Sequence, residues 1–369
     1  MAELKKLLRA LARKSMREEV GKRSGWFKTA AQISGAAWVS TIVAFLATVV
    51  AARGLGPTDF GEVVLAVAVT GAIATFLDIS LEEAVVHHGA KAVEAKDIGG
   101  LRAIVRNSIK VDLGAGLVVS GLMIAFAGPL ADLASKGHLP SILIQIGALQ
   151  ALVTTLDATT GASLLVAGRP ALRGWAMATQ ATLRLVGVLI ALQLGGEEAV
   201  MIAYLVAALV ASAIQATITW RVAWRPWAAQ SSLGTSPVPV RKLFRFGMHT
   251  SFATSVSALH QYLFPVILGR LASIEAVGIF KIAMLPVTLA DTVSGPIRIV
   301  VLPQQARLAA QNRWNQLRRA MSIYTGVGLA ISAVGFVVGW FLLPTLIPAI
   351  YSSAFGGAVE PARILMVAA

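Results

Sequence analysis

Few ionisable side chains fall inside the long apolar stretches of this chain, and these residues are the first candidates for a functional role. Arg184 lies in the middle of one stretch, one helical turn after Gln180, and Lys281 lies near the start of another. A guanidinium can bind a phosphate through two hydrogen bonds, so Arg184 is a candidate anion ligand. Two alternatives stay open: an ion pair of Arg184 with Asp157 that holds two helices together, and a Lys281 side chain that extends to the membrane surface.

Two carboxylates and one imidazole also fall within apolar stretches. Asp157 and Asp291 are candidate sites for a coupling proton or Na⁺, because burial favours the protonated form of a carboxyl group. His260, near the middle of its stretch, is a candidate to line a cavity or to pass on a proton. A structural, hydrogen-bonded role is the alternative for each of the three. Asp112 is expected at the start of a helix, where an acid needs no functional explanation.

The composition excludes several other kinds of chemistry. The chain has no cysteine and only five histidines, and it contains neither an HExxH pair nor a GxxxxGK[ST] phosphate loop. It therefore cannot form a disulfide or a cysteine-ligated metal site, and nothing supports ATP hydrolysis. We expect no metal, no cofactor and no enzyme activity. Apolar residues make up 56% and charged residues 14%, whereas a soluble domain usually has roughly twice that charged share. This composition predicts an all-α integral membrane protein.

Nine apolar stretches are long enough to cross a bilayer as helices. They are expected at 29–52, 60–80, 109–133, 141–167, 171–194, 199–220, 246–268, 276–301 and 324–348. A tenth stretch begins at Pro361 and stops at Ala369, so we expect a partial tenth span in a fragment of a longer protein. Residues 1–28 are basic and carry leucines at helical spacing. They predict an amphipathic helix in the membrane interface, with a solvated basic tail as the alternative.

The basic residues are distributed unevenly between the two sides of the predicted membrane. Most of the 32 Lys and Arg residues fall in the first 28 residues and in every second connection, whereas the other connections carry only Arg53, Lys136 and Arg270. The positive-inside rule therefore predicts a cytoplasmic N-terminus. This distribution also accounts for the net charge of +14 without any nucleic-acid partner.

An internal repeat indicates how the spans are organised. Arg53 and Gly61 recur as Arg270 and Gly278, 217 positions later, at the same places between apolar stretches. Six spans separate the two copies, an even number, so the two halves have the same orientation and form a parallel repeat. We expect the two arginines to fix the tight outer turn of their own half. The predicted organisation is a cytoplasmic segment at 1–28, a six-helix bundle at 29–220, a cytoplasmic linker at 221–245 and an incomplete second bundle at 246–369.

Three local motifs carry a family resemblance. The first follows the first span and reads Ala52-Arg53-Gly54-Leu55-Gly56-Pro57-Thr58-Asp59-Phe60-Gly61. The second is Asp78-Ile79-Ser80-Leu81-Glu82-Glu83-Ala84, and the third comprises Pro286, Pro296 and Leu302-Pro303. In this order, and with the repeat, the motifs resemble the polysaccharide and O-antigen flippases of the multidrug/oligosaccharidyl-lipid/polysaccharide exporter superfamily.

The resemblance implies a flippase in the bacterial cytoplasmic membrane. Such a protein moves an oligosaccharide on an isoprenoid pyrophosphate to the periplasmic leaflet, by ion-coupled alternating access. The product would feed polysaccharide polymerase machinery that makes O-antigen, lipopolysaccharide or exopolysaccharide. The alternatives are a cation-coupled multidrug exporter of the same superfamily and a non-functional fragment. A membrane glycosyltransferase is disfavoured, because the outer loops are short.

For such a flippase, the ionisable residues and prolines inside the predicted spans can be given roles. Substrate binding would fall to Arg184, Lys281, His260 and Gln180, and H⁺ or Na⁺ coupling to Asp157 and Asp291. Asp78 would be a gate contact, for which an ordinary interfacial aspartate is the alternative. Pro286 and Pro296 would be hinges, because a proline leaves backbone carbonyls without their helical partners; static kinks are the alternative.

Overall fold

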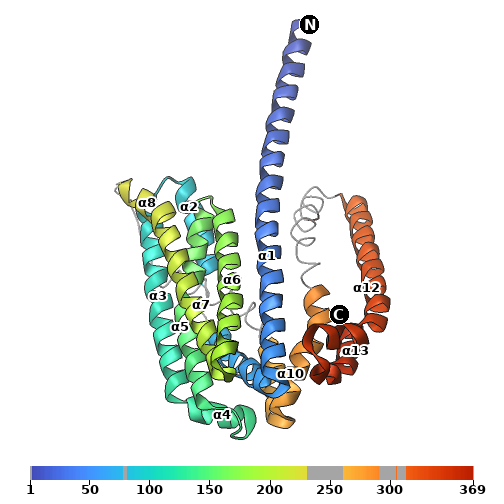
Figure 1. Cartoon of the computed structure of the whole chain (residues 1–369). Coiled ribbons are helices and arrows are strands. Elements are labelled where there is room, and N and C mark those ends of the chain that lie inside the picture. The colour runs from blue at the N-terminus through green and yellow to red at the C-terminus, as the bar shows by residue number, and fades with distance from the viewer. Residues whose placement is uncertain (1, 78–80, 231–260, 291–304, 306–312, 369) are drawn as a thin grey trace.

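The computed structural model describes residues 2–77, 81–230, 261–290, 305 and 313–368, and this part of the chain is helical (Figure 1). The elements are α1 Ala2–Leu77, α2 Glu82–Glu94, α3 Ile98–Ala125, α4 Ala127–Ser135, α5 Ser141–Val166, α6 Pro170–Leu194, α7 Gly196–Thr219, the π-helical turn η1 Trp220–Trp224, α8 Arg225–Ala229, α10 Ile274–Ala283, α12 Trp314–Tyr351, the 3₁₀ turn η2 Ser353–Ala358 and α13 Val359–Ala368. Residues 261–271 and 285–290 are helical as well.

Six helices of the described part are long and apolar enough to cross a membrane. They are Trp38–Thr75, Ile98–Ala125, Ser141–Val166, Pro170–Leu194, Gly196–Ala229 and Trp314–Tyr351. Large apolar side chains such as Leu117 and Val118 of α3 and Ile190 of α6 are exposed on them. This is the arrangement expected where the solvent is lipid rather than water.

Helix α1 contains two of the predicted spans. Gly56 has φ of 78° and ψ of 178°, which are not helical values, and it breaks α1 into two limbs. A glycine adopts this positive φ without the steric cost that a Cβ atom brings. Pro57 then starts the second limb, a position where its missing N–H costs no helical hydrogen bond. The Gly-Pro pair of the first motif is therefore the turn between the two limbs.

Three predicted boundaries differ from the structure. Residues 2–28 continue the helix of the first span and project past the other helices (Figure 1), instead of forming a separate interfacial helix. The predicted span 109–133 is wrong: α3 begins at Ile98, after Asp97 has capped it by accepting a bond from the Gly100 N–H, and α4 follows separately. The linker was predicted to begin at 221, but the helix continues past that residue through η1 and α8 to Ala229.

The helices have two recognisable ends in Figure 1. We call the end with the N-terminus, α2 and α8 the inner end, and the end with α4 and α10 the outer end. Buried apolar residues form one large cluster that includes Leu65, Met201, Val277 and Tyr351, and so joins helices from both repeats. A smaller cluster around Leu101 packs α2 against α3, α5 and α8.

The second repeat follows the element order of the first. Adding 217 to the bounds of α3 and α4, 98–135, gives 315–352, which matches α12 at Trp314–Tyr351. The same shift takes Pro57, the start of the second limb of α1, to Ile274, the start of α10. The sequence repeat is therefore also a structural repeat.

Candidate functional site

A cavity of about 300 Å³ is lined mainly by the first repeat, with Tyr262 contributed by the second. Its walls come from the second limb of α1, from α3 and α5, and from the ring of Tyr262, which approaches Gly71 so closely that a Cβ there would lie 2.5 Å from the ring. Many of the lining groups are hydroxyls or amides, which suits a hydrated or polar guest rather than an apolar one. The polar lining residues are Thr70, Thr75, Asp112, Ser120, Gln150, Thr154, Thr155 and Tyr262.

Asp112 is the charged residue of this lining. It is only 5% exposed, and its Oδ2 accepts a hydrogen bond from the Thr159 hydroxyl of α5. The expectation that Asp112 starts a helix is wrong, because α3 begins 14 residues earlier and places Asp112 at mid-helix. An ionisable group at that depth is costly and is usually functional. It is therefore the residue that sequence reasoning undervalued.

Asp112 belongs to a polar seam between α3 and α5. On α3, small or polar residues recur every four positions at Ser108, Asp112, Gly116 and Ser120, all buried. On α5 the facing positions are Thr155, Thr159 and Ser163. At Gly116 a Cβ would lie 2.8 Å from the Thr155 hydroxyl oxygen, so the two backbones approach closely. Small residues with hydroxyls are the usual means of packing helices in lipid. This spacing was the signal in the sequence that could have identified Asp112.

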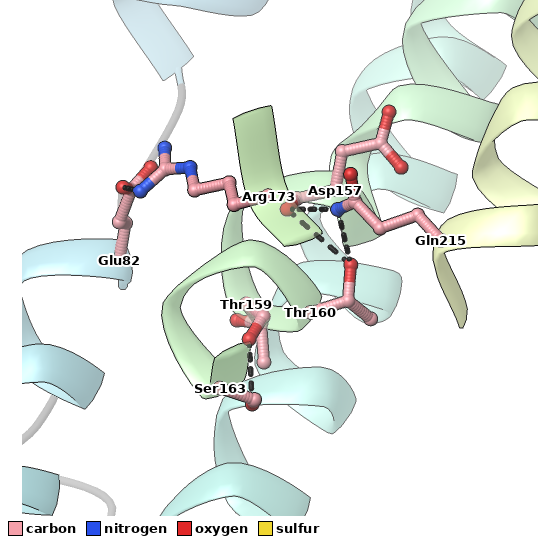
Figure 2. A network of polar contacts seen from close by, with 7 residues as sticks. All are labelled: Glu82, Asp157, Thr159, Thr160, Ser163, Arg173 and Gln215. Atoms are coloured by element: carbon pink, nitrogen blue, oxygen red, sulfur yellow. Dashed lines mark hydrogen bonds and ion pairs between the residues drawn. The ribbon is translucent and has the colours of Figure 1, made fainter. Parts of the chain in front are cut away.

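A second network joins α5 to α7 near the inner end (Figure 2). The amide nitrogen of Gln215 donates to the Asp157 carbonyl and to the Thr160 hydroxyl, at 2.8 Å in each case. Thr219 donates to the Thr160 carbonyl at 3.3 Å. The Asp157 carboxylate lies beside Ser212 of α7. The described residues show no ion pair between Asp157 and Arg184.

An ion pair holds the inner end of this region. Arg173, near the start of α6, pairs with Glu82 at the start of α2 (Figure 2). The aliphatic part of Arg173 also covers Gly161 of α5, where a Cβ would lie 3.3 Å from the guanidinium Nε. Arg173 therefore connects α2, α5 and α6. Glu82 belongs to the second sequence motif, which gives that motif a structural role.

Arg184 occupies a different place, on α6 toward the outer end. Its guanidinium carbon lies 3.7 Å from the centroid of the Tyr204 ring of α7, a cation–π contact that fixes the plane of the group. Its Nε is buried and makes no hydrogen bond to the described residues. Gln180 lies one turn earlier on α6 and is half-buried. Lys281, an exposed residue of α10, lies within electrostatic range of Arg184, so each repeat contributes one cation.

Four predicted site residues, Asp78, His260, Asp291 and Pro296, lie outside the described residues. Pro286 is described: it is half-buried in the helical stretch 285–290, after a turn at Met284. In the part of the chain that the structure describes, no group of three or more His, Asp or Glu residues is placed to hold a metal ion.

The comparisons with known proteins place this geometry in a family. Residues 27–309 match the family model described as polysaccharide biosynthesis protein, which is more than half of the chain. The comparison with curated proteins gives no significant match.

Solved structures of low sequence identity share the fold. An inward-facing multidrug resistance MATE family transporter of the MOP superfamily is 17% identical, with a TM-score of 0.71 over 88% of this chain and 76% of that chain. An outward-facing one is 17% identical, with a TM-score of 0.60 over 92% and 78%. A MOP superfamily transporter from Pyrococcus furiosus is 18% identical, with a TM-score of 0.60 over 92% and 78%. The chain therefore belongs to the polysaccharide biosynthesis protein family, and it is a multi-pass membrane protein that shares the fold of the solved MATE family structures.

Proposed function

We propose that the chain moves an oligosaccharide linked to an isoprenoid pyrophosphate across the bacterial cytoplasmic membrane, toward polymerase machinery that builds a surface polysaccharide. The observation that carries this proposal is the pair of cations, Arg184 and Lys281, contributed by opposite repeats within electrostatic range of each other. Membership of the polysaccharide biosynthesis family supports the substrate class.

Two cations near each other inside a membrane protein repel, and the low dielectric strengthens that repulsion. The arrangement becomes favourable when an anion binds between them. Tyr204 orients the Arg184 guanidinium, leaving its donors available for an oxygen-rich group such as pyrophosphate. The Arg184 Nε is a buried donor of this kind. Because the two cations come from different repeats, an anion bound to both would also respond to movement of one repeat against the other.

For ion coupling, the first repeat offers a candidate beyond those that the sequence predicted. Asp112 has what a site for H⁺ or Na⁺ requires: a buried carboxylate, a hydroxyl partner and an adjoining cavity with several hydroxyl and amide groups in its wall. Asp157 is the second candidate. In this proposal Asp291 keeps its predicted role on the other repeat.

The arrangement of the helices supports a state open to the cytoplasm. The TM-score is higher for the inward-facing transporter, 0.71, than for the outward-facing one, 0.60. In alternating access, the inner opening admits the head group, and the outer end opens after the repeats have moved.

The test is flipping by the full chain in vesicles. A fluorescent isoprenoid-pyrophosphate oligosaccharide is placed in one leaflet, and its appearance in the other is followed by lectin capture. Arg184→Ala should slow flipping by about tenfold or more, as expected for the loss of charge-assisted hydrogen bonds, and Arg184→Glu should abolish it. Lys136→Ala removes a cation from α4's outer end and serves as the control. Wild-type flipping by Arg184→Glu would refute the role of Arg184.

A cation-coupled multidrug exporter is the second candidate, and one observation favours it. Asp112 and the Tyr262 ring line the same cavity, and an acid beside an aromatic ring suits an organic cation. Uptake of a cationic dye by the same vesicles separates the two functions. Dye transport that Asp112→Asn abolishes and Arg184→Glu leaves intact would favour the exporter.

A further inference from the structure

The two repeated arginines each reach into the opposite repeat. Arg53, in the first repeat, donates from Nη2 to the Ala349 carbonyl of α12 at 2.8 Å. Arg270, in the second repeat, donates from Nη1 to the Asp132 carbonyl of α4 at 3.1 Å. The two donors are 217 positions apart, and so are the two acceptors. The contacts are therefore one interaction made twice, once in each direction across the molecule.

The same relation holds for two glycines beside these arginines. A Cβ at Gly61 would collide with the Ile274 carbonyl, and a Cβ at Gly278 would collide with the Pro57 carbonyl. Pro57 and Ile274 are again 217 positions apart. The second limb of α1 and helix α10 thus cross in backbone contact, and the crossing is symmetric. Glycine is needed at both positions because any side chain would separate the two helices.

The acceptors are suited to a cation. Ala349 lies in the last turn of α12, and Asp132 lies in the last turn of α4. Carbonyls in the last turn of a helix form the negative end of its dipole and can accept a further donor. The Asp132 carbonyl, for example, also accepts the backbone N–H of Lys136 at 2.9 Å. A guanidinium there makes a charge-assisted hydrogen bond. Each arginine therefore caps a helix of the other repeat, and not the turn of its own repeat, as the sequence had led us to expect.

We propose that Arg53 and Arg270 form a reciprocal latch that holds the outer ends of the two repeats together, and that opens when the transporter faces outward. The inference rests on alternating access as proposed above, and adds the contacts that control it. Each arginine spans from one repeat to the other, so both bonds must break when the outer ends separate. The latch also gives a function to the arginine of the first family motif and to its copy.

The natural absence of cysteine makes the latch testable by spin labelling of the full chain in nanodiscs. One pair of labels, at Leu194 and Leu271, reports the outer separation across the repeats; both side chains are exposed. In Arg53→Ala/Arg270→Ala the outer distances should lengthen. The ratio of outward-open to closed molecules should rise by about tenfold for each bond lost. An outer distance distribution unchanged from the unsubstituted chain would overturn the latch.

A second pair of labels, at Trp175 and Met321, reports the inner ends, where the distances should shorten as the outer ones lengthen. Lys136→Gln is the matched control, because it removes a cation at the outer end of α4, and should change neither distribution. If the double variant does not fold, Arg53→Lys and Arg270→Lys replace it: each keeps the charge but loses the forked donor, so each should shift the distribution part of the way. The measurement uses no substrate, so it can fail or succeed independently of the flippase assignment.

Discussion

The glycine crossing at the outer end gives a prediction whose size follows from the structure. In Gly61→Ala, the new Cβ would lie 2.9 Å from the Ile274 carbonyl carbon and 3.1 Å from its Cγ2. Ordinary carbon contacts are about 3.5–4.0 Å. The nearest obstacle is the Ile274 carbonyl oxygen, so the two helices must move apart by roughly 1 Å or more, because the obstacle is backbone and cannot rotate away. In Gly278→Ala the Cβ would lie 3.2 Å from the Pro57 carbonyl carbon and would also collide with its oxygen.

Overpacking of this kind costs roughly 1–3 kcal/mol. Alanine returns up to about 1 kcal/mol through its better helix propensity. We therefore expect each substitution to lower the free energy of unfolding by about 1–2 kcal/mol. The double variant should lose less than the sum of the two, since one separation of the helices relieves both collisions.

The assay is thermal unfolding of the purified full chain in detergent. Gly114→Ala and Gly121→Ala of α3 are matched controls, because a Cβ at either position meets nothing within 4 Å. Those two variants should unfold at the wild-type temperature or slightly above it, whereas Gly61→Ala and Gly278→Ala should unfold below it. If all four variants unfold at the same temperature, the close crossing of α1 and α10 is refuted.

Three further perturbations address the first repeat. Gln215→Leu should lower the free energy of unfolding by about 1–2 kcal/mol, because it removes the two 2.8 Å bonds to α5, and unchanged thermal unfolding would contradict this. Glu82→Arg and Arg173→Glu should each cost up to about 1 kcal/mol, and the two together should restore stability in a double-mutant cycle. Tyr204→Leu should weaken binding of the labelled isoprenoid-pyrophosphate substrate by about tenfold, because it removes the ring beneath Arg184, whereas Tyr204→Phe should retain binding.

The sequence was informative where a helix ends at a local signal. The expected spans 141–167 and 171–194 agree closely with α5 and α6, which begin just after Pro140 and at Pro170, and the first motif contains the Gly-Pro pair that forms the turn in α1. The sequence was misleading where charged residues lay within a segment that is helical in the structure. Arg102 and Arg106 read as a loop before the expected span, yet a long helix can carry basic side chains at its inner end while its remainder crosses the membrane. That error moved the expected start of α3 and hid Asp112.

The candidate site was less predictable for a different reason. Arg184 and Lys281 could be singled out because an isolated charge in an apolar stretch is conspicuous. The contacts of Arg184 and Asp112 could not be predicted, since Tyr204 and Thr159 are common residues that become important only through packing between helices. The repeat located Arg53 and Arg270 correctly, but an offset between two residues does not tell which half each side chain enters.

The repeat also distinguishes the contacts that join the two halves at the outer end from the residues proposed to bind ligands. The outer contacts obey the 217-residue shift, as Gly61 with Ile274 and Gly278 with Pro57 show. The candidate ligand-binding residues have no counterpart at this shift: the position equivalent to Lys281 is Val64, and the position equivalent to Asp112 is Leu329. A symmetric outer contact lets the two repeats close on each other through matching surfaces. In the proposed function, an ion bound in the first repeat and an anion bound between the repeats would act on that shared closure from different places. The transport of one ligand can be coupled to that of another only if both ligands shift the same conformational equilibrium. A shared closure with two separate binding sites meets this requirement.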